Sequence, residues 1–388
     1  MKKILFIIPS LEIGGTLSSF ISLYNQLCVK YDIHIFALSH DGLQDIPFAS
    51  SLLPKDKLIH AYRCKLSNTS GLYKYFVAGI KIACRVLRVL KIKESCIYNF
   101  AIRKLNNKYD VVIGFQEELP NEFASKILSK KKIAWIHCDY SRHPACGKEL
   151  NIYKKFDKIV CVSKYTAEVF KEYYPELSDR IGYIYNILDK QKILNKSVDK
   201  NLDSRFLKDN FTIISVGRIT KVKRFEFIPK IANFLKQKGL NFQWYIIGPN
   251  IGDTCFYELQ NNIKLFQVDD CVIYLGGKSN PYPYFKNSNL LVSLSMSEAC
   301  PMIFNEAKIL GIPSISTDFP TASEFIKDGF DGKICTLEQM GEVIFNVMKN
   351  DEYYRYLLFN VQNQLYSNDE ILLRLDTLLQ CNRSVNYT

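Results

Sequence analysis

The chain of 388 residues has little of the residue types that build metal centres and disulfide frameworks. It contains five histidines, all within the first 143 residues, and its twelve cysteines include no C-x-x-C pair. A zinc cluster is therefore not expected. In a large chain without a secretory signal, the scattered cysteines are expected to be small core residues and not disulfide partners.

Long hydrophobic runs are also missing. The longest apolar stretches are far shorter than the roughly 20 residues that span a bilayer. Met1-Lys2-Lys3 is followed by an apolar run that stops at Pro9, too short for a signal peptide and without a cleavage site. We interpret this stretch as the first buried strand of a cytoplasmic protein.

Three motifs that would identify a ligand are absent. The sequence has no G-x-G-x-x-G fingerprint, which makes a dehydrogenase the least favoured enzyme. It has no D-x-D in the segments that carry the candidate site, so neither a metal nor another cofactor is expected. No nucleic-acid reader motif accompanies the basic residues, and nucleic acid is not an expected partner.

The pattern that is present alternates buried strands with helices, which is typical of a parallel α/β fold. Strands are predicted at 3–9, 33–38, 110–114, 132–137, 157–163, 181–185, 211–216, 244–248, 271–275, 290–294 and 312–316. Helices are predicted at 17–29, 164–173, 225–237, 281–287 and 301–310, with a helical tail over 337–379. Residues 187–210 are polar, show no clear period and are interpreted as the interdomain linker and the entry to the second domain.

The segment 290–316 is the most informative unit. A helix beginning at Pro301 leaves the backbone amides of Met302, Ile303 and Phe304 without helical partners, and such an end attracts phosphate. Glu298 precedes this helix and Glu306 lies one turn inside it. The alternative is that both are solvated acids near a helix N-terminus, where acids are favoured anyway.

Polar residues also follow several other predicted strands. Arg218 and Lys223 lie after the strand at 211–216, where they could bind a diphosphate or be solvated surface cations. His137 follows the strand at 132–137, at an edge where ligands bind, although a lone histidine is more often structural. Gly15 and Asn186 lie in turns after two further strands, and the glycine turn could equally serve helix packing alone.

The seven residues between Glu298 and Glu306 give an E-x7-E element that, together with G-R-x4-K at Arg218 and Lys223, resembles retaining glycosyltransferases of family 4. The resemblance covers residues 3 to 350 and is strongest from 211 to 332. It implies the GT-B architecture, two Rossmann-like domains that face a central cleft. The expected domains are 1–190 on the acceptor side, 191–365 for the nucleotide sugar, and a helical tail, 366–388, that packs back on the first domain.

The resemblance also implies a role for each candidate residue. Glu298 would contact the donor sugar, Glu306 the ribose, and Arg218 and Lys223 the diphosphate. The remaining contacts implied are the phosphates near Gly15 and the first-turn amides of Met302 and Ile303, the donor sugar at His137, and the cleft wall at Asn186. Glu324, Gly329 and Gly332 fit the closing turn of the family.

Three positions depart from the family pattern. Arg224 replaces a small residue, which puts the local backbone geometry in doubt. Ala299 and the pair Thr321-Ala322 stand where the family has glycines. Both of these departures could narrow the sugar pocket, so they leave the identity of the donor sugar open.

The function implied is transfer of a sugar from a nucleotide sugar, expected to be a UDP-sugar, to a hydroxyl of a lipid-linked saccharide in surface polysaccharide synthesis. Arg218, Lys223, Glu298 and His137 are the residues expected to take part in catalysis. Two alternatives remain: a nucleotide-sugar epimerase of the same architecture, and a non-catalytic scaffold at a membrane surface.

Positive charge is concentrated in one segment. Residues 61–108 hold eleven Lys or Arg and one acid, against a net charge of +12 for the whole chain. Five basic residues are predicted to line one helical face: Lys74, Lys81, Arg85, Arg88 and Lys91. Such a helix can lie on an anionic lipid surface, although an ordinary surface helix would also carry charge. We therefore expect residues 71–108 to contact the inner face of the cytoplasmic membrane.

Overall fold

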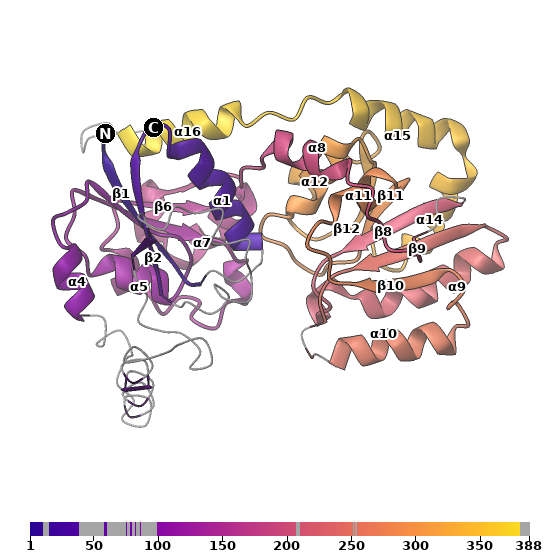
Figure 1. Cartoon of the computed structure of the whole chain (residues 1–388), viewed down its shortest axis with the longest axis horizontal. Helices are drawn as coiled ribbons and strands as arrows, with labels where there is room; N and C mark the ends of the chain where they lie inside the picture. The colour runs from indigo at the N-terminus through magenta and orange to yellow at the C-terminus, as the bar shows by residue number, and fades with distance from the viewer. Residues whose placement is uncertain are drawn as a thin grey trace. The chain divides into compact units, whose positions relative to one another are not determined.

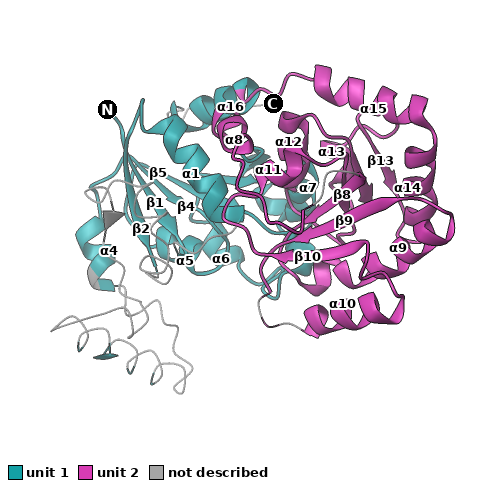
Figure 2. Cartoon of the chain, turned by 45° about the vertical axis from the view of Figure 1, so that its right-hand side comes forward, with its two compact units in different colours: residues 1–187, 369–388 teal, residues 188–368 magenta. Residues whose placement is uncertain are grey.

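The computed structural model describes residues 1–10, 15–38, 58–59, 75, 78–79, 82, 86, 99–206, 210–250, 252 and 254–380. The chain divides into two compact units, one formed by residues 1–187 and 369–388 and the other by residues 188–368 (Figure 2). The predicted boundaries, 190 and 365, lie three residues from the observed ones, 187 and 368.

The first unit is built on a seven-stranded parallel sheet in the order β3-β2-β1-β4-β5-β6-β7 (Figure 1). The strands are β1 (Lys3–Ile8), β2 (Asp32–Ala37), β3 (Leu58–Ile59), β4 (Val111–Gly114), β5 (Lys131–Ile136), β6 (Lys158–Cys161) and β7 (Ile181–Tyr183). The helices are α1 (Gly15–Leu27), α4 (Asn99–Leu105), α5 (Leu119–Ser125), α6 (Leu150–Tyr153) and α7 (Lys164–Tyr173). β1 pairs with β2 on one side and with β4 on the other, so the order in which successive strands are added to the sheet reverses beside β1. Ligands of such folds commonly bind at this point.

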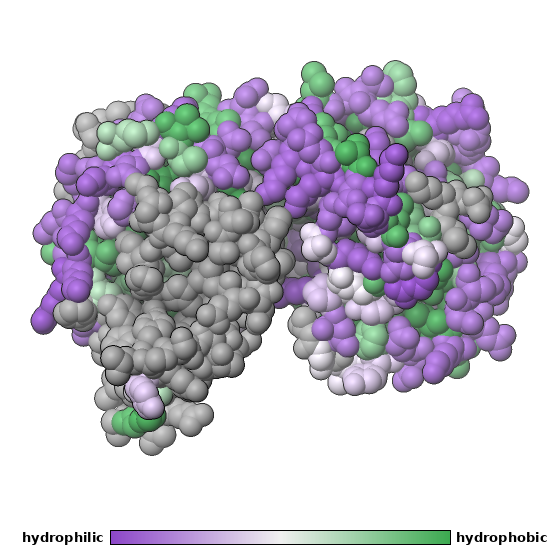
Figure 3. All heavy atoms as spheres, viewed as in Figure 1, coloured by the Kyte–Doolittle hydropathy of each residue, from purple (hydrophilic) through white to green (hydrophobic). Residues whose placement is uncertain are grey.

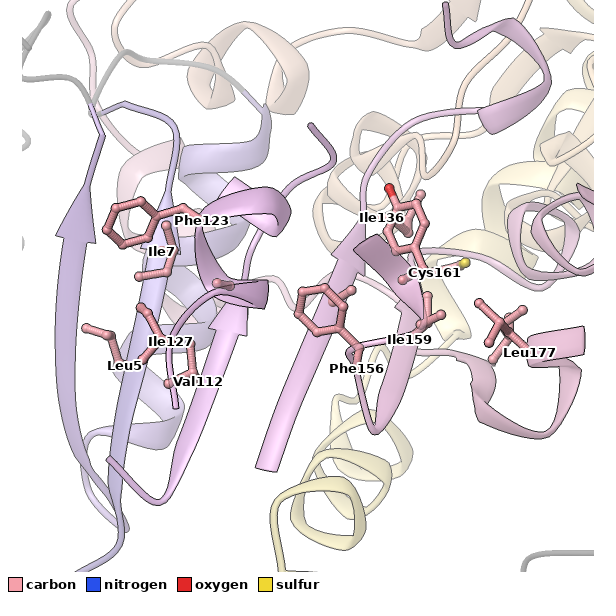
Figure 4. Close-up of a cluster of buried hydrophobic side chains, with 14 of the residues drawn as sticks. Leu5, Ile7, Val112, Phe123, Ile127, Ile136, Phe156, Ile159, Cys161 and Leu177 are labelled. Carbon is pink, nitrogen blue, oxygen red and sulfur yellow. The ribbon is translucent and has the colours of Figure 1, made fainter. Parts of the chain in front are cut away.

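Both faces of this sheet are covered by apolar side chains. Figure 4 shows Phe123 of α5 and Ile127, which follows this helix, lying against Leu5, Ile7 and Val112 of the sheet. On the other face, an aromatic cluster joins β1, α1 and the end of β4, with ring centroids 5.3 to 5.7 Å apart. Its members are Phe6, Phe20 and Phe115. Burial on both faces explains why these strands are continuous apolar runs in the sequence.

The second unit contains a six-stranded parallel sheet in the order β10-β9-β8-β11-β12-β13. Its strands are β8 (Phe211–Val216), β9 (Phe242–Ile247), β10 (Val272–Gly276), β11 (Leu290–Ser293), β12 (Ser314–Thr317) and β13 (Gly332–Cys335). The helices are α8 (Lys190–Ser197), α9 (Ile228–Gln237), α10 (Thr254–Leu265), α11 (Tyr282–Lys286), α12 (Met302–Leu310), α13 (Ala322–Phe325), α14 (Met340–Lys349) and α15 (Asp351–Asn363). The alternation of strands and helices predicted from the sequence is thus present in both units, and the α/β class is confirmed.

The core of the second unit joins the sheet to α9, α10 and α14. Trp244 at its centre is fully buried, and its indole N–H donates to Ser215 Oγ at 3.0 Å. Ser215 in turn donates to the carbonyl of Val292 at 2.7 Å. The buried indole N–H of Trp244 and the hydroxyl of Ser215 are therefore both hydrogen-bonded, as buried polar groups need to be. On the face drawn in Figure 3, hydrophobic residues are interspersed among hydrophilic ones at the described surface.

The segment 187–210, interpreted as the interdomain linker and the entry to the second domain, contains α8, a helix of the second unit that was not predicted from the sequence. Asp189 caps it, because its carboxylate accepts the N–H of Lys192 at 2.9 Å. Ile193 and Ser197, one turn apart, are the buried side chains, and the helix packs on α11 and α12. Only two of eight side chains face the core, so the segment shows almost no apolar period in the sequence.

The last helix, α16 (Asp369–Gln380), belongs to the first unit although it follows the second in the chain. Lys2 Nζ and Lys131 Nζ donate to backbone carbonyls in its last turn, those of Leu379 at 3.1 Å and Leu378 at 2.5 Å. Cations at this end of a helix satisfy free carbonyls and complement its dipole. The helix therefore lies beside β1 (Figure 1).

The basic segment predicted to meet a membrane falls mostly outside the described residues. Residues 75, 78–79, 82 and 86 are helical, and the five cations predicted to line one face are not among them. In the part of the chain that the structure describes, no helix is long and apolar enough to span a bilayer. The eight described cysteines are all free thiols, as expected.

Candidate active site

The loop between β11 and β12 forms the start of α12 as predicted from the sequence. Pro301 is the N-cap, with φ −73° and ψ 92°, and Gly311 ends the helix in a left-handed conformation with φ 73°. The amide of Phe304 was predicted to be free, but it donates to the carbonyl of Pro301 at 3.3 Å. Met302 and Ile303 keep amides without a hydrogen-bond partner among the described residues, so the helix still presents two donors.

Lys223 and Glu298 are brought together by this loop and the one after β8. The ammonium of Lys223 forms an ion pair with Glu298 Oε1, and both side chains are largely buried. Ser295 Oγ donates to the same carboxylate oxygen at 2.7 Å, and Thr321 Oγ1 donates to the Glu298 carbonyl at 2.7 Å. The Glu298 backbone and carboxylate are thus held from two sides, which leaves Oε2 as the oxygen available to a ligand.

Backbone contacts hold the two loops in register. The amide of Met296 donates to the carbonyl of Val222 at 2.8 Å, between the loops that carry Glu298 and Lys223. A Cβ at Gly248 would lie 1.7 Å from the carbonyl oxygen of Gly217, so only glycine allows β8 and β9 to end this close together. The two glycines therefore determine where Arg218 leaves the sheet.

Arg218 is exposed and forms no ion pair with any described residue. It lies two residues beyond the end of β8, at the same sheet edge as the loop of Glu298. Arg224, the departure from the family pattern, adopts a left-handed conformation with φ 53° and ψ 33°. That conformation favours a small residue, which accounts for the residue type usual at this position.

Glu306 faces α11 from the first turns of α12. Tyr282 Oη donates to Glu306 Oε1 at 3.1 Å. Burial raises the pKa of the Glu306 carboxyl to about 7, although the Tyr282 hydrogen bond acts in the opposite direction. The carboxyl therefore changes charge close to neutral pH, which is unusual for glutamate.

His137, at the end of β5 in the first unit, is held by a residue that the sequence analysis did not identify. Glu117, which is 7% exposed, accepts the backbone N–H of His137 at 2.9 Å. The imidazole packs on Phe115 at 4.5 Å between ring centroids, and its buried Nε2 has no partner among the described groups. Burial lowers the pKa of His137 to about 3, so the ring is neutral at physiological pH.

Gly15 and Asn186 both lie in the first unit, beside α1. Gly15 is the first residue of α1 and has open space where a Cβ would stand. Ser19, on the next turn, donates from Oγ to Asn186 Oδ1 at 2.7 Å. The contact explains why Asn186 is almost fully buried.

Other nearby polar residues have local structural roles or were missed. Asp139 caps the short helix η4 (Tyr140–Arg142) by accepting the amide of Ser141 at 3.2 Å. The residues not identified from the sequence are Ser19, Glu117, Tyr282 and Ser295, and the contact of Thr321 with Glu298 was not expected from its place in the family pattern. Only Ser295 lies close in sequence to the residue it contacts. Within the described ranges, no group of three or more His, Cys, Asp or Glu side chains is arranged to hold a metal ion.

Two units with parallel Rossmann-like sheets, with a cation and a carboxylate joined beside a helix N-terminus in the second, define a GT-B glycosyltransferase fold. A solved structure of HepE from Anabaena with UDP has a TM-score of 0.73 at 14% identity and covers 97% of this chain and 99% of that one. A second neighbour, TarM, has a TM-score of 0.72 at 13% identity and covers 98% and 99%. At these identities the likeness establishes the fold alone.

The sequence comparisons match a family model within the second unit and several named relatives. Residues 199–360 match the family model for glycosyl transferases group 1. An uncharacterized glycosyltransferase of Methanocaldococcus jannaschii is 29% identical over 172 residues, 44% of this chain but only 41% of the relative. A Campylobacter jejuni relative is 23% identical over 377 residues, 96% of this chain and 95% of the relative. Its name is GalNAc-alpha-(1->4)-GalNAc-alpha-(1->3)-diNAcBac-PP-undecaprenol alpha-1,4-N-acetyl-D-galactosaminyltransferase.

Proposed function

We propose that the protein is a retaining glycosyltransferase that moves a sugar from a UDP-sugar to a hydroxyl of a lipid-linked saccharide in surface polysaccharide synthesis. The observation that carries this proposal is the Lys223–Glu298 pair beside the two free amides of α12. The UDP named in the Anabaena structure supports the donor class. The undecaprenol diphosphate saccharide named for the Campylobacter relative supports the acceptor class.

The proposed chemistry follows from charge. As the sugar–phosphate bond breaks, its electron pair leaves with the diphosphate and the sugar becomes oxocarbenium-like. Groups aimed at the growing negative charge lower the barrier most. The hydrogen-bond donors proposed for this role are Arg218, Lys223 and the amides of Met302 and Ile303. Arg218 has no ion-pair partner among the described residues, so no carboxylate of the protein competes with the diphosphate for its guanidinium.

Glu298 is proposed to bind hydroxyls of the donor sugar. Before a donor arrives, the Lys223 ammonium is neutralised by this carboxylate. An incoming diphosphate would share Lys223 with Glu298, and the carboxylate could then accept a sugar hydroxyl in place of part of the ion pair. Glu298 is thus proposed to act in orientation, and Ser295 to hold its carboxylate in place.

The acceptor oxygen forms the new bond to the anomeric carbon on the face from which the diphosphate leaves. We propose that its proton passes to the leaving phosphate oxygen, and we name no protein nucleophile. His137 does not suit the role of general base, because its pKa of about 3 leaves it too weakly basic to take a proton from a hydroxyl. We propose that it binds the donor sugar as a neutral hydrogen-bonding group.

We also propose that transfer needs no metal ion, since the cations and amides of the protein would neutralise the diphosphate. Full activity after dialysis against EDTA is the expected result. Restoration of lost activity by Mg²⁺ or Mn²⁺ would contradict this part of the proposal.

Contact with the inner face of the cytoplasmic membrane is proposed for residues 71–108. Among the described residues of this segment, Tyr75, Ile82 and Val86 are 78%, 62% and 50% exposed, a high exposure for apolar side chains. Exposed apolar groups within a basic segment are typical of helices that lie on lipid. Co-sedimentation with vesicles containing anionic lipid, and not with neutral vesicles, is expected. Equal recovery with both would contradict the proposal.

The main experiment is a screen of nucleotide sugars with purified protein, using hydrolysis and thermal shift as readouts. For Glu298→Ala we expect loss of transfer with nucleotide binding retained, because Glu298 is assigned to the sugar and not to the nucleotide. Equal loss of nucleotide binding would show that this assignment is wrong. Formation of an epimeric nucleotide sugar without an acceptor would favour the epimerase instead.

A further inference from the structure

The second unit contains a cavity of about 250 Å³ at the C-terminal end of α12, away from the amides of Met302 and Ile303. Residues from four helices and from the segment after α15 line it. The side chains used below are Lys190, Lys286, Lys308, Gln362, Gln364 and Tyr366. No carboxylate is among the lining residues, so the charged residues that line the cavity are three lysines.

One of these positive charges is already neutralised. Lys308 Nζ lies 2.7 Å from Asp331 Oδ2, and Asp331 is only 2% exposed. Asp331 also accepts from the Lys327 amide at 2.8 Å and from Gln364 Nε2 at 2.9 Å. Lys308 is therefore a fixed part of the wall, with its counter-ion behind it.

Lys190 and Lys286 have no ion-pair partner in the described part of the chain, and they leave the cavity with two uncompensated positive charges. Lys286 ends α11, where a cation is favoured by the helix dipole. Lys190 is the first residue of α8, where the same dipole disfavours a cation. Helix capping thus explains Lys286 and does not explain Lys190.

We propose that this cavity binds a small phosphate-type anion with at least two negative charges, such as phosphate or diphosphate. Lysines bind phosphate as point charges, and the Gln362 amide, which makes no hydrogen bond to a described residue, can add a donor. A volume of 250 Å³ equals that of about eight waters, enough for inorganic diphosphate. It is below the roughly 300–1,000 Å³ typical of drug-sized ligands, which favours a small anion over a nucleotide sugar.

The wall of the cavity includes a junction between distant parts of the chain. Tyr366 Oη accepts the amide of Leu188 at 3.3 Å, and Asn368 Nδ2 donates to the carbonyl of Leu188 at 2.8 Å. Residues 188 and 368 are the first and last of the second unit, so these hydrogen bonds close the unit at its two ends. An anion held between Lys190 and this wall stabilises that closure and therefore the folded unit.

The test is a thermal titration of the full chain with sodium pyrophosphate at constant ionic strength. We expect the wild-type Tm to rise by about 3 °C at a tenfold excess over Kd. The variant Lys190→Gln/Lys286→Gln should lose this rise. The matched control, Lys230→Gln/Lys264→Gln, removes two exposed lysines from α9 and α10 and should keep it.

Two further measurements separate this site from the proposed donor site. The pyrophosphate shift should persist in Arg218→Ala, whereas stabilisation by UDP should persist in Lys190→Gln/Lys286→Gln. Equal melting of the variant and the wild type without anion shows that both fold. The proposal is overturned if the wild type shows no shift, if the double variant keeps it, or if Arg218→Ala removes it. Absence of a UDP effect alone would count against the proposed function and not against this cavity.

Discussion

At the scale of single residues, the candidate donor-binding side chains differ in the partners that they already have within the protein. Arg218 is exposed and unpaired among the described residues, Lys223 is bound to Glu298, and Glu306 is hydrogen-bonded to Tyr282. A substitution at Arg218 should therefore act on ligands alone. Substitutions at the other positions also change the free protein.

For Arg218→Ala we expect turnover to fall by about 10²- to 10³-fold, the usual loss for one preorganised donor to a developing anion. Because Arg218 has no described ion-pair partner, Tm should stay within about 1 °C of the wild type. Initial rates and thermal melting measure the two quantities. Lys221→Ala removes another exposed cation three residues away and should leave turnover nearly unchanged. Near-wild-type turnover in Arg218→Ala would remove Arg218 from the mechanism.

The ionisation of Glu306 predicts a pH-dependent nucleotide affinity. If Glu306 accepts ribose hydroxyls as the resemblance implies, it binds best as a carboxylate, which forms above its pKa of about 7. Affinity for UDP should then rise about tenfold between pH 6 and pH 8. Calorimetric titration of Glu306→Gln measures any contribution from UDP itself. A variant with the same pH dependence as the wild type would contradict this assignment.

The same ionisation predicts a change in stability of the opposite direction. The folded-state pKa of about 7 lies above the ordinary 4.5, so the folded protein binds more protons than the unfolded chain in this window. Its contribution to stability is therefore present at low pH and is lost as pH rises toward 7. The free energy of unfolding of Glu306→Gln minus that of the wild type, measured with urea, should therefore increase from pH 5 to pH 8. A constant difference across this range would show that Glu306 titrates normally.

At the scale of elements, α8 has only two buried side chains, Ile193 and Ser197, so its N-cap is expected to make a measurable contribution to its stability. Asp189→Ala should lower the free energy of unfolding of the second unit by about 1 kcal/mol, the usual loss of an N-cap. Urea unfolding followed by fluorescence in a Trp135→Phe background, in which Trp244 is the remaining tryptophan, reports on this unit. Asp269→Ala, an exposed acid that caps nothing, is the control and should change stability by less than about 0.5 kcal/mol. Equal effects would show that the Asp189–Lys192 contact does not stabilise α8.

The sequence predicts most directly the strands that are buried on both faces. The strands predicted at 3–9 and 211–216 correspond to β1 and β8, because strands buried on both faces are apolar throughout. α8 was not predicted, and only two of its eight side chains are buried. A helix on the outer layer leaves too few apolar positions for its period to be recognised.

The site shows the same division. Glu298 and Lys223 were each recognisable beside a strand end, but their ion pair joins positions 75 apart in sequence. Glu117 and Tyr282 were missed because their effects depend on contacts with His137 and Glu306, 20 and 24 residues away. Residue types at strand ends can be read locally, whereas the partners that set their charge depend on which strands become neighbours.

At the scale of the whole molecule, the chain returns to its first unit after completing the second. α16 is attached there by charge, through Lys2, Lys131 and the Lys30–Asp376 ion pair at 2.7 Å. Arg374 lies over the ring of Tyr183 at 4.5 Å. The apolar contribution comes from Leu375 and Leu379, each 1% exposed. The first unit is therefore incomplete until α16 has folded onto it.

Leu375→Ala should lower the free energy of unfolding of the first unit by about 2–5 kcal/mol, because it leaves a cavity under α16. Leu373→Ala, two residues earlier on the same helix, removes a side chain that is 68% exposed and should cost less than about 0.5 kcal/mol. The chain has two tryptophans, and Trp135 is the one in the first unit. Urea unfolding followed by fluorescence in a Trp244→Phe background therefore isolates that unit. Similar losses for the two variants would mean that α16 does not stabilise the first unit through its buried face.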